Sequence, residues 1–113
     1  MTSSNSLAQP SPYSLIVDLS GNKQTAQAVH DIAWCYERSE KHQKARELYQ
    51  YVVDTWPDSD YVMQSRAGLI RADIGLGRME VADAAVDKLL ADFSEHWQIA
   101  QLVHDIACCY ERS

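Results

Sequence analysis

An eleven-residue segment that occurs twice limits what this chain can fold into more than any other feature. Residues 29–39 read VHDIAWCYERS, and residues 103–113 read VHDIACCYERS. The two copies differ only where Trp34 is replaced by Cys108, and they begin 74 positions apart. Such close agreement indicates that a structural unit has been repeated.

Half of that distance recurs between other residues of the chain. Ala45 and Ala82 are 37 positions apart, as are Trp56 and Phe93. A fixed period of roughly 20–50 residues is typical of proteins that stack one small unit on the next. The period therefore predicts a repeat architecture.

Apolar residues recur at steps of three and four, which indicates amphipathic helices. Ala26, Val29 and Ala33, for example, share one helical face. No segment alternates with a period of two, so the sequence predicts no strands. The expected helices cover residues 23–38, 43–55, 60–76, 79–93 and 96–112, with Ser94 as N-cap of the last and a short helix over 13–19.

The residue pattern resembles the tetratricopeptide repeat (TPR). The residues that carry the resemblance are Val29, Ile32, Ala33, Tyr36, Ala45, Tyr49, Val52 and Pro57. The family period is about 34 residues, and the longer period here, with the ending WPDSD at residues 56–60, is similar to a variant of bacterial envelope proteins. The resemblance implies a right-handed α-solenoid of antiparallel helix pairs.

In this interpretation residues 1–11 are a flexible lead-in and residues 12–113 form the repeat array. The array would contain two full repeats and two partial ones, which cover residues 23–59, 60–96, 12–22 and 97–113. The middle repeat departs from the pattern, because Ile70 replaces the small Ala33 and Asp73 replaces Tyr36. We therefore expect its first helix to be shifted or more loosely packed.

Composition and charge exclude several classes of protein. The chain has a net charge of −6 and no basic run, which disfavours nucleic acid and anionic membranes as partners. It has no apolar run of about 18–20 residues, so no membrane insertion is expected. No signal peptide is recognisable at the start. Three cysteines favour reduced thiols and a cytoplasmic location, whereas the resemblance allows a bacterial envelope, so the localisation stays open.

We expect the first helix of each repeat to expose one face for binding a protein or peptide, as repeat proteins use their concave surface. Small residues at Ala67 and Gly68, flanked by Trp34 and Arg71, would leave a notch for one side chain. The candidate ligand-binding residues are Gln27, His30, Asp31, Trp34, Arg38, Gln64, Arg71, His104 and Cys108.

Three other interpretations compete with binding. The face could be merely solvated, or the chain could be a structural, self-associating part of a longer array. His104 and Cys108 lie one turn apart, as zinc ligands can, but the complete ligand set that zinc requires is missing. No metal or other cofactor is therefore expected, and Cys35 and Cys109 are expected to be small buried side chains.

An enzyme is not expected from this sequence. His30 and Cys35 would lie on helix faces about 140° apart, whereas a nucleophile and its base must be within hydrogen-bond reach. The chain contains no Gly-rich phosphate loop and no nucleophile elbow.

The last helix carries an apolar stripe with only the preceding helices to cover it. The stripe comprises Val103, Ile106, Ala107 and Tyr110. Leaving large apolar side chains in water forgoes about 1.5–3 kcal/mol each. Residues 96–113 are therefore expected to mediate self-association, either as a homodimer or head to tail.

Overall fold

Five helices joined by short connections make up the part of the chain that can be described. The computed structural model describes residues 23–113, and over this range it contains no strand. The helices are α3 (Lys23–Arg38), α4 (His42–Thr55), α5 (Val62–Gly75), α6 (Met79–Phe93) and α7 (Ile99–Arg112). The all-α class is confirmed, and each helix begins and ends within three residues of its expected position.

Two expectations fall outside this range. The short helix over residues 13–19 and the lead-in over residues 1–11 lie outside the described residues. Within residues 23–113, none of the helices combines the length and the apolar character that crossing a bilayer would need.

The turns that end α3 and α5 have the same geometry, 37 residues apart. The N–H groups of Lys41 and Arg78 each donate to the carbonyl five residues earlier, at 2.9 and 2.8 Å. The residues before them are left-handed, with φ of 62° at Glu40 and 79° at Gly77. This is the Schellman ending of a helix. Glycine adopts it freely, whereas at Glu40 it costs about 1–2 kcal/mol.

The connections that precede α5 and α7 also match at this spacing. The Tyr61 N–H donates to Ser59 Oγ at 2.9 Å, and the Gln98 N–H donates to His96 Nδ1 at 3.1 Å. A hydroxyl in one unit is thus replaced by an imidazole in the next. The expected N-cap at Ser94 is wrong, because this residue ends α6 and α7 begins five residues later.

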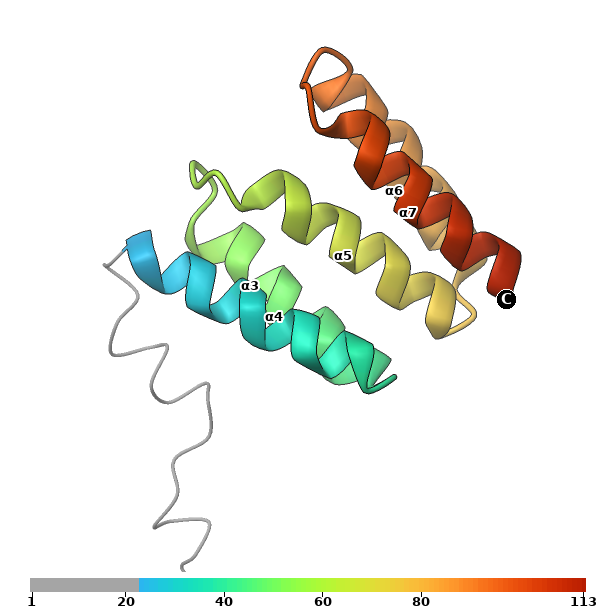
Figure 1. The fold of residues 1–113 in the computed structure, drawn as a ribbon, viewed down its shortest axis with the longest axis horizontal. Helices are drawn as coiled ribbons and strands as arrows, with labels where there is room; N and C mark the ends of the chain where they lie inside the picture. The colour runs from blue at the N-terminus through green and yellow to red at the C-terminus, as the bar shows by residue number, and fades with distance from the viewer. Residues whose placement is uncertain (1–22) are drawn as a thin grey trace, which may run out of the picture.

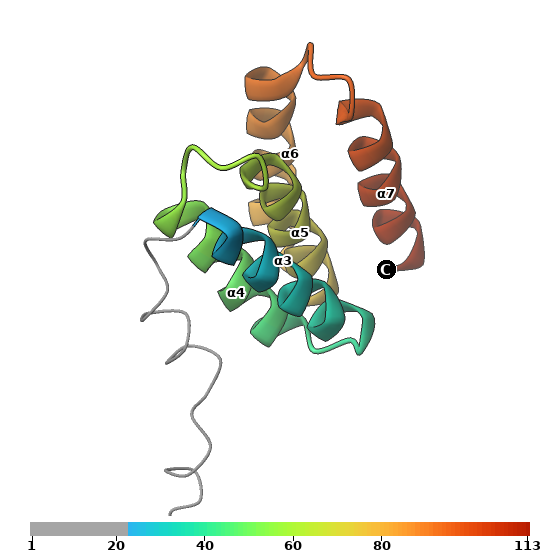
Figure 2. The same ribbon diagram turned by 60° about the vertical axis from the view of Figure 1, so that its left-hand side comes forward.

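Helix α5 is the centre of the molecule. It contacts each of the other four helices, and Figure 1 shows it between the α3–α4 pair and the α6–α7 pair. In that view α3 lies in front of α4, and α7 lies in front of α6. Figure 2 shows α6 and α7 spread apart at their ends, consistent with the packing of α7 on α5.

Buried side chains form two cores. The first comprises Ala26, Val29, Ala33, Ala45, Leu48, Tyr49, Val52 and Trp56, from α3, α4 and the residue after α4. The second comprises Met63, Ala67, Ile70, Ile74, Ala82, Leu89 and Ile106, from α5, α6 and α7. Because α5 supplies the second core and also packs on α4, it joins the two.

The expectation of a loose middle repeat is wrong. Helix α5 is buried on several sides, and a Cβ atom added at Gly68 would lie 2.5 Å from the Tyr49 ring. The absence of a side chain there lets α4 and α5 approach closely. Gly68 and Ala67 are both buried, so these small residues are occupied by packing and leave no notch.

Asp73 does not weaken the packing either. Its carboxylate is 3% exposed and accepts from Arg46 Nε at 2.7 Å, with Arg78 Nη1 at 3.8 Å. Thirty-seven residues later the same helix positions are joined by Tyr110, whose hydroxyl donates to Asp83 at 2.5 Å. The contact between units is therefore kept while its chemistry changes.

Candidate functional site

Two hollows between α3, α5 and α7 meet at Trp34 and Arg71. The first has a volume of about 690 Å³ and the second about 420 Å³, within the range of roughly 300–1,000 Å³ common for ligand sites. Both residues line both hollows. We call the two hollows together the α3–α5–α7 groove.

The two ends of the groove differ in chemistry. The end that we call the basic hollow is lined by Trp34, Glu37, Arg38, Glu40, His42, Arg71, Ile74, Gly75, Cys109, Arg112 and Ser113. The end that we call the amide hollow is lined by His30, Trp34, Gln64, Arg71, Trp97, Gln98, Gln101, Leu102 and Asp105. Guanidinium groups are concentrated in the first, and three glutamine amides in the second.

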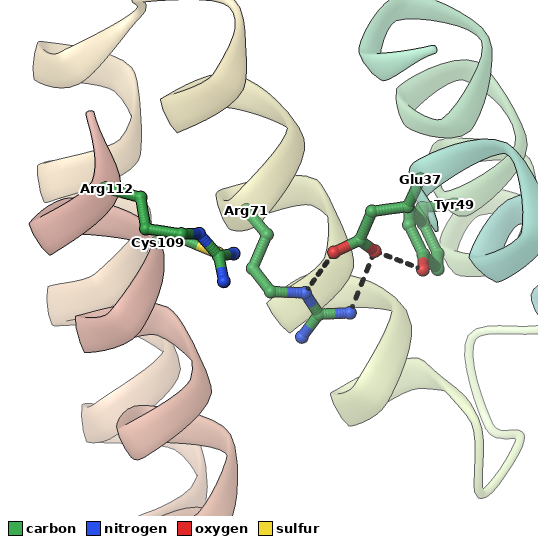
Figure 3. Close-up of polar contacts among 5 residues, drawn as sticks. All are labelled: Glu37, Tyr49, Arg71, Cys109 and Arg112. Atoms are coloured by element: carbon green, nitrogen blue, oxygen red, sulfur yellow. Dashed lines mark hydrogen bonds and ion pairs between the residues drawn. The ribbon is translucent and has the colours of Figure 1, made fainter. Parts of the chain in front are cut away.

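Arg71 is held in the groove wall by a network that joins three helices (Figure 3). Its Nε and Nη2 donate to the two oxygens of Glu37 at 2.7 and 3.1 Å. The Tyr49 hydroxyl donates to Glu37 Oε1 at 2.6 Å. A guanidinium that makes two parallel bonds to one carboxylate is fixed in orientation. The network therefore links α3, α4 and α5.

Burial makes these contacts strong. Burial by itself would lower the pKa of Arg71, but the hydrogen bonds and charge of Glu37 raise it well above its usual value. Burial, and next the Glu37 charge, raise the pKa of Tyr49, so its hydroxyl stays protonated. Arg71 is thus permanently ionised and already neutralised by Glu37.

Trp34 contrasts with this fixed wall. The core does not hold its ring, which is 46% exposed. The guanidinium of Arg38, one turn later, lies 5.8 Å from the ring centre, a cation–π distance. Trp34 therefore offers a large aromatic surface in the middle of the groove.

Helix α7 supplies the opposite wall of the basic hollow. Figure 3 shows the Arg112 guanidinium directed toward the side of α5 that carries Arg71. Arg112 Nη2 lies 3.4 Å from Cys109 Sγ, and burial raises the pKa of the Cys109 thiol. Three arginines against Glu37 and Glu40 make this end locally positive in an acidic protein.

His30 lies where the amide hollow meets the first core. Its Nδ1 is 3.0 Å from Ser65 Oγ, and its ring packs between those of Tyr49 and Tyr61 at 5.5 and 5.6 Å between centres. Burial lowers the pKa of His30, while the nearby Asp31 charge acts in the opposite direction. Its neutral form is therefore favoured in the folded protein.

The outer part of the amide hollow is more open. Gln64 Nε2 donates to Gln98 Oε1 at 3.4 Å, which links α5 to the segment before α7. Beside them the Trp97 side chain is 83% exposed. Amides can donate to and accept from a peptide backbone, and an exposed indole offers an apolar surface next to them.

Five of the nine candidate ligand-binding residues line the groove, namely His30, Trp34, Arg38, Gln64 and Arg71. The other four, Gln27, Asp31, His104 and Cys108, line neither hollow. The reason is geometric. Helices α3 and α7 contact α5 from different sides, so α7 turns Leu102, Asp105 and Cys109 to the groove rather than the residues equivalent to those of α3.

Sequence reasoning missed several groove residues and misplaced one cysteine. Trp97, Gln98 and Cys109 line the groove without having been candidates. Trp97 carried a signal, because it belongs to no apolar stripe of its helix. The expectation that Cys35 is buried is wrong, since its side chain is exposed.

The thiols and imidazoles do not assemble further within residues 23–113. His104 Nε2 lies 3.7 Å from Cys108 Sγ. Over that range no three His, Cys, Asp or Glu side chains converge as metal ligands would, so this pair has no third ligand there.

Taken by its chemistry, the groove presents an indole face, guanidinium groups and side-chain amides. Such groups hold a partner by stacking and hydrogen bonding. In comparisons with known proteins, no family model, curated protein or solved structure matches this chain.

Proposed function

We propose that this chain is a non-catalytic module that binds a protein or peptide in the α3–α5–α7 groove. The proposal includes the fold: a TPR-like, right-handed solenoid of antiparallel helix pairs, in which α3, α5 and α7 are the first helices of successive units. The ligand would be an extended segment, since the groove is elongated and crosses three helices. No metal or cofactor takes part.

Two features support this view of the fold. Helix α5 contacts both α3 and α7, so helices two apart in the chain are neighbours, as in a stack of helix pairs. The turns after α3 and α5, and the connections before α5 and α7, share their hydrogen bonds at the 37-residue spacing. A regular stack would place the first helices along one surface.

The observation that carries the functional proposal is the position of Trp34. It lies where the two hollows meet, it is half exposed, and the packing of the core does not require it. Indole and guanidinium groups at the centre of an interface are the usual binding anchors. A ligand that spans both hollows must pass this ring.

The sharpest test uses the difference between the two sequence copies. A peptide selected from a random library against the immobilised 113-residue chain serves as the probe, under reducing conditions. Trp34→Cys makes residues 29–39 identical to residues 103–113. We expect it to weaken binding by about fivefold or more, equivalent to about 1 kcal/mol, with an unchanged helical circular dichroism signal.

Leu90→Ala is the matched control, because Leu90 is an exposed apolar residue of α6 outside both hollows. It should leave the affinity unchanged. Equal affinities for the Trp34→Cys and unmodified chains would refute the proposal. Arg71→Ala is a poorer test, because it removes the partner of the part-buried Glu37 and so disturbs folding as well as binding.

A further inference from the structure

One face of α7 is chemically identical to a buried face of α3 but is largely uncovered. In α3 the residues Ala26, Val29 and Ala33 are at most 1% exposed. Their counterparts 74 residues later are Ala100, Val103 and Ala107, of which the two alanines are exposed and the valine is part-buried. We call these three α7 residues the α7 strip.

The structure shows what covers such a strip. In α3 it is α4, whose Ala45, Leu48, Tyr49 and Val52 are fully buried in the same core. The spacing of these four residues forms one helical face. Alanines at the crossing allow the two backbones to approach closely.

The polar part of this recognition is also duplicated. The Tyr49 hydroxyl of α4 donates to Glu37 of α3. The equivalent residue of α7 is Glu111, whose side chain is exposed. Helix α7 therefore displays both the apolar strip and the acceptor that α4 uses on α3.

We infer that the α7 strip is a docking site for an amphipathic helix of a partner protein, with the apolar pattern of α4. The partner helix would place a small residue against Ala107 and an aromatic hydroxyl or similar donor at Glu111. A second copy of this chain does not offer its α4 for this purpose, because that apolar face is fully buried against its own α3.

This site is separate from the α3–α5–α7 groove. The α7 residues that line the groove include Leu102, Asp105 and Cys109. At 100° per residue, the strip lies on the opposite side of the helix from these residues. Docking on the strip therefore does not depend on peptide binding in the groove, and each can fail alone.

The test is a titration of the isotope-labelled 113-residue chain with a synthetic peptide of residues 42–55, followed by NMR. We expect saturable shifts of the amides of residues 100–111, with residues 26–33 unaffected. Ala107→Arg in the chain should weaken binding by about fivefold or more, because it puts a charge at the crossing. Trp34→Cys should not change it.

A peptide carrying Leu48→Glu is the control for non-specific binding and should cause no saturable shift. Three results would overturn the inference. The first is no shift on α7 at millimolar peptide. The second is a shift on α3, which would mean exchange with the chain's own α4. The third is concentration-dependent broadening of α7 without peptide, which would identify a second copy as the occupant.

Discussion

Residues 29–39 and 103–113 differ at one position of eleven, yet the structure gives them different surroundings. In the first copy Val29 and Ala33 are buried and Glu37 is engaged by two other helices. In the second copy Ala107 and Glu111 are exposed. Neighbouring helices, rather than the segment itself, decide which residues are structural.

The reason lies in what packs on each helix. Helix α3 is covered by α4 on one side and contacts α5 on another. Helix α7 rests on α5 and buries chiefly Ile106, at 2% exposed. The same residue types can thus serve as core in one place and as surface in another, and pairs of equivalent substitutions measure the difference.

The largest difference is expected at the glutamates. Glu37→Ala leaves the part-buried Arg71 without its carboxylate and Tyr49 without its acceptor. Removing one partner of a buried pair costs about 3–5 kcal/mol, and we expect about 3 because Glu37 retains 15% exposure. Glu111→Ala should change the free energy of unfolding by less than about 0.5 kcal/mol. Urea unfolding of both variants checks this, and equal losses would contradict it.

A smaller difference is expected at the alanines. Ala33 is fully buried, so Ala33→Leu overpacks the crossing of α3 and α4 and should cost about 1–3 kcal/mol. Ala107→Leu should stay within about 0.5 kcal/mol because the site is exposed. Midpoints of thermal unfolding provide the measurement. A loss at position 107 as large as that at 33 would show that α7 has a hidden covering.

The smallest effect is expected from the histidines and depends on pH. Because burial lowers the pKa of His30 in the folded state, the unfolded chain binds more protons just below pH 6.5, and stability should fall as the pH drops through that value. His30→Gln should reduce this slope, whereas His104→Gln, at an exposed position, serves as the control. Unfolding at pH 7.5 and pH 5.5 compares them. An unchanged slope for His30→Gln would mean that the imidazole is not desolvated.

Much of the fold was predictable from the sequence, because helices depend on local periodicity. Ala45 and Ala82 repeat at 37 residues and are both fully buried, so the period also identified core positions. The middle unit was misjudged at Asp73, since a buried carboxylate is stable only with partners such as Arg46, which lies 27 positions earlier. Such pairing between distant residues has no local signal.

The candidate site was predictable only in part, for a similar reason. Trp34 and Arg71 were identified and line the groove, because their helix faces follow from periodicity. His104 and Cys108 were chosen by analogy with α3, but α7 meets α5 from another side. The orientation of one helix relative to another depends on packing of the whole molecule, which a repeat alone does not specify.

Amide hydrogen exchange offers the most direct test of the central claim, that identical segments acquire different roles from their neighbours. The shared residues have nearly the same intrinsic exchange rates, so differences in protection report the surroundings alone. At low micromolar concentration we expect the amides of residues 33–37 to be clearly more protected than those of residues 107–111. Equal protection, or greater protection in α7, would contradict the account.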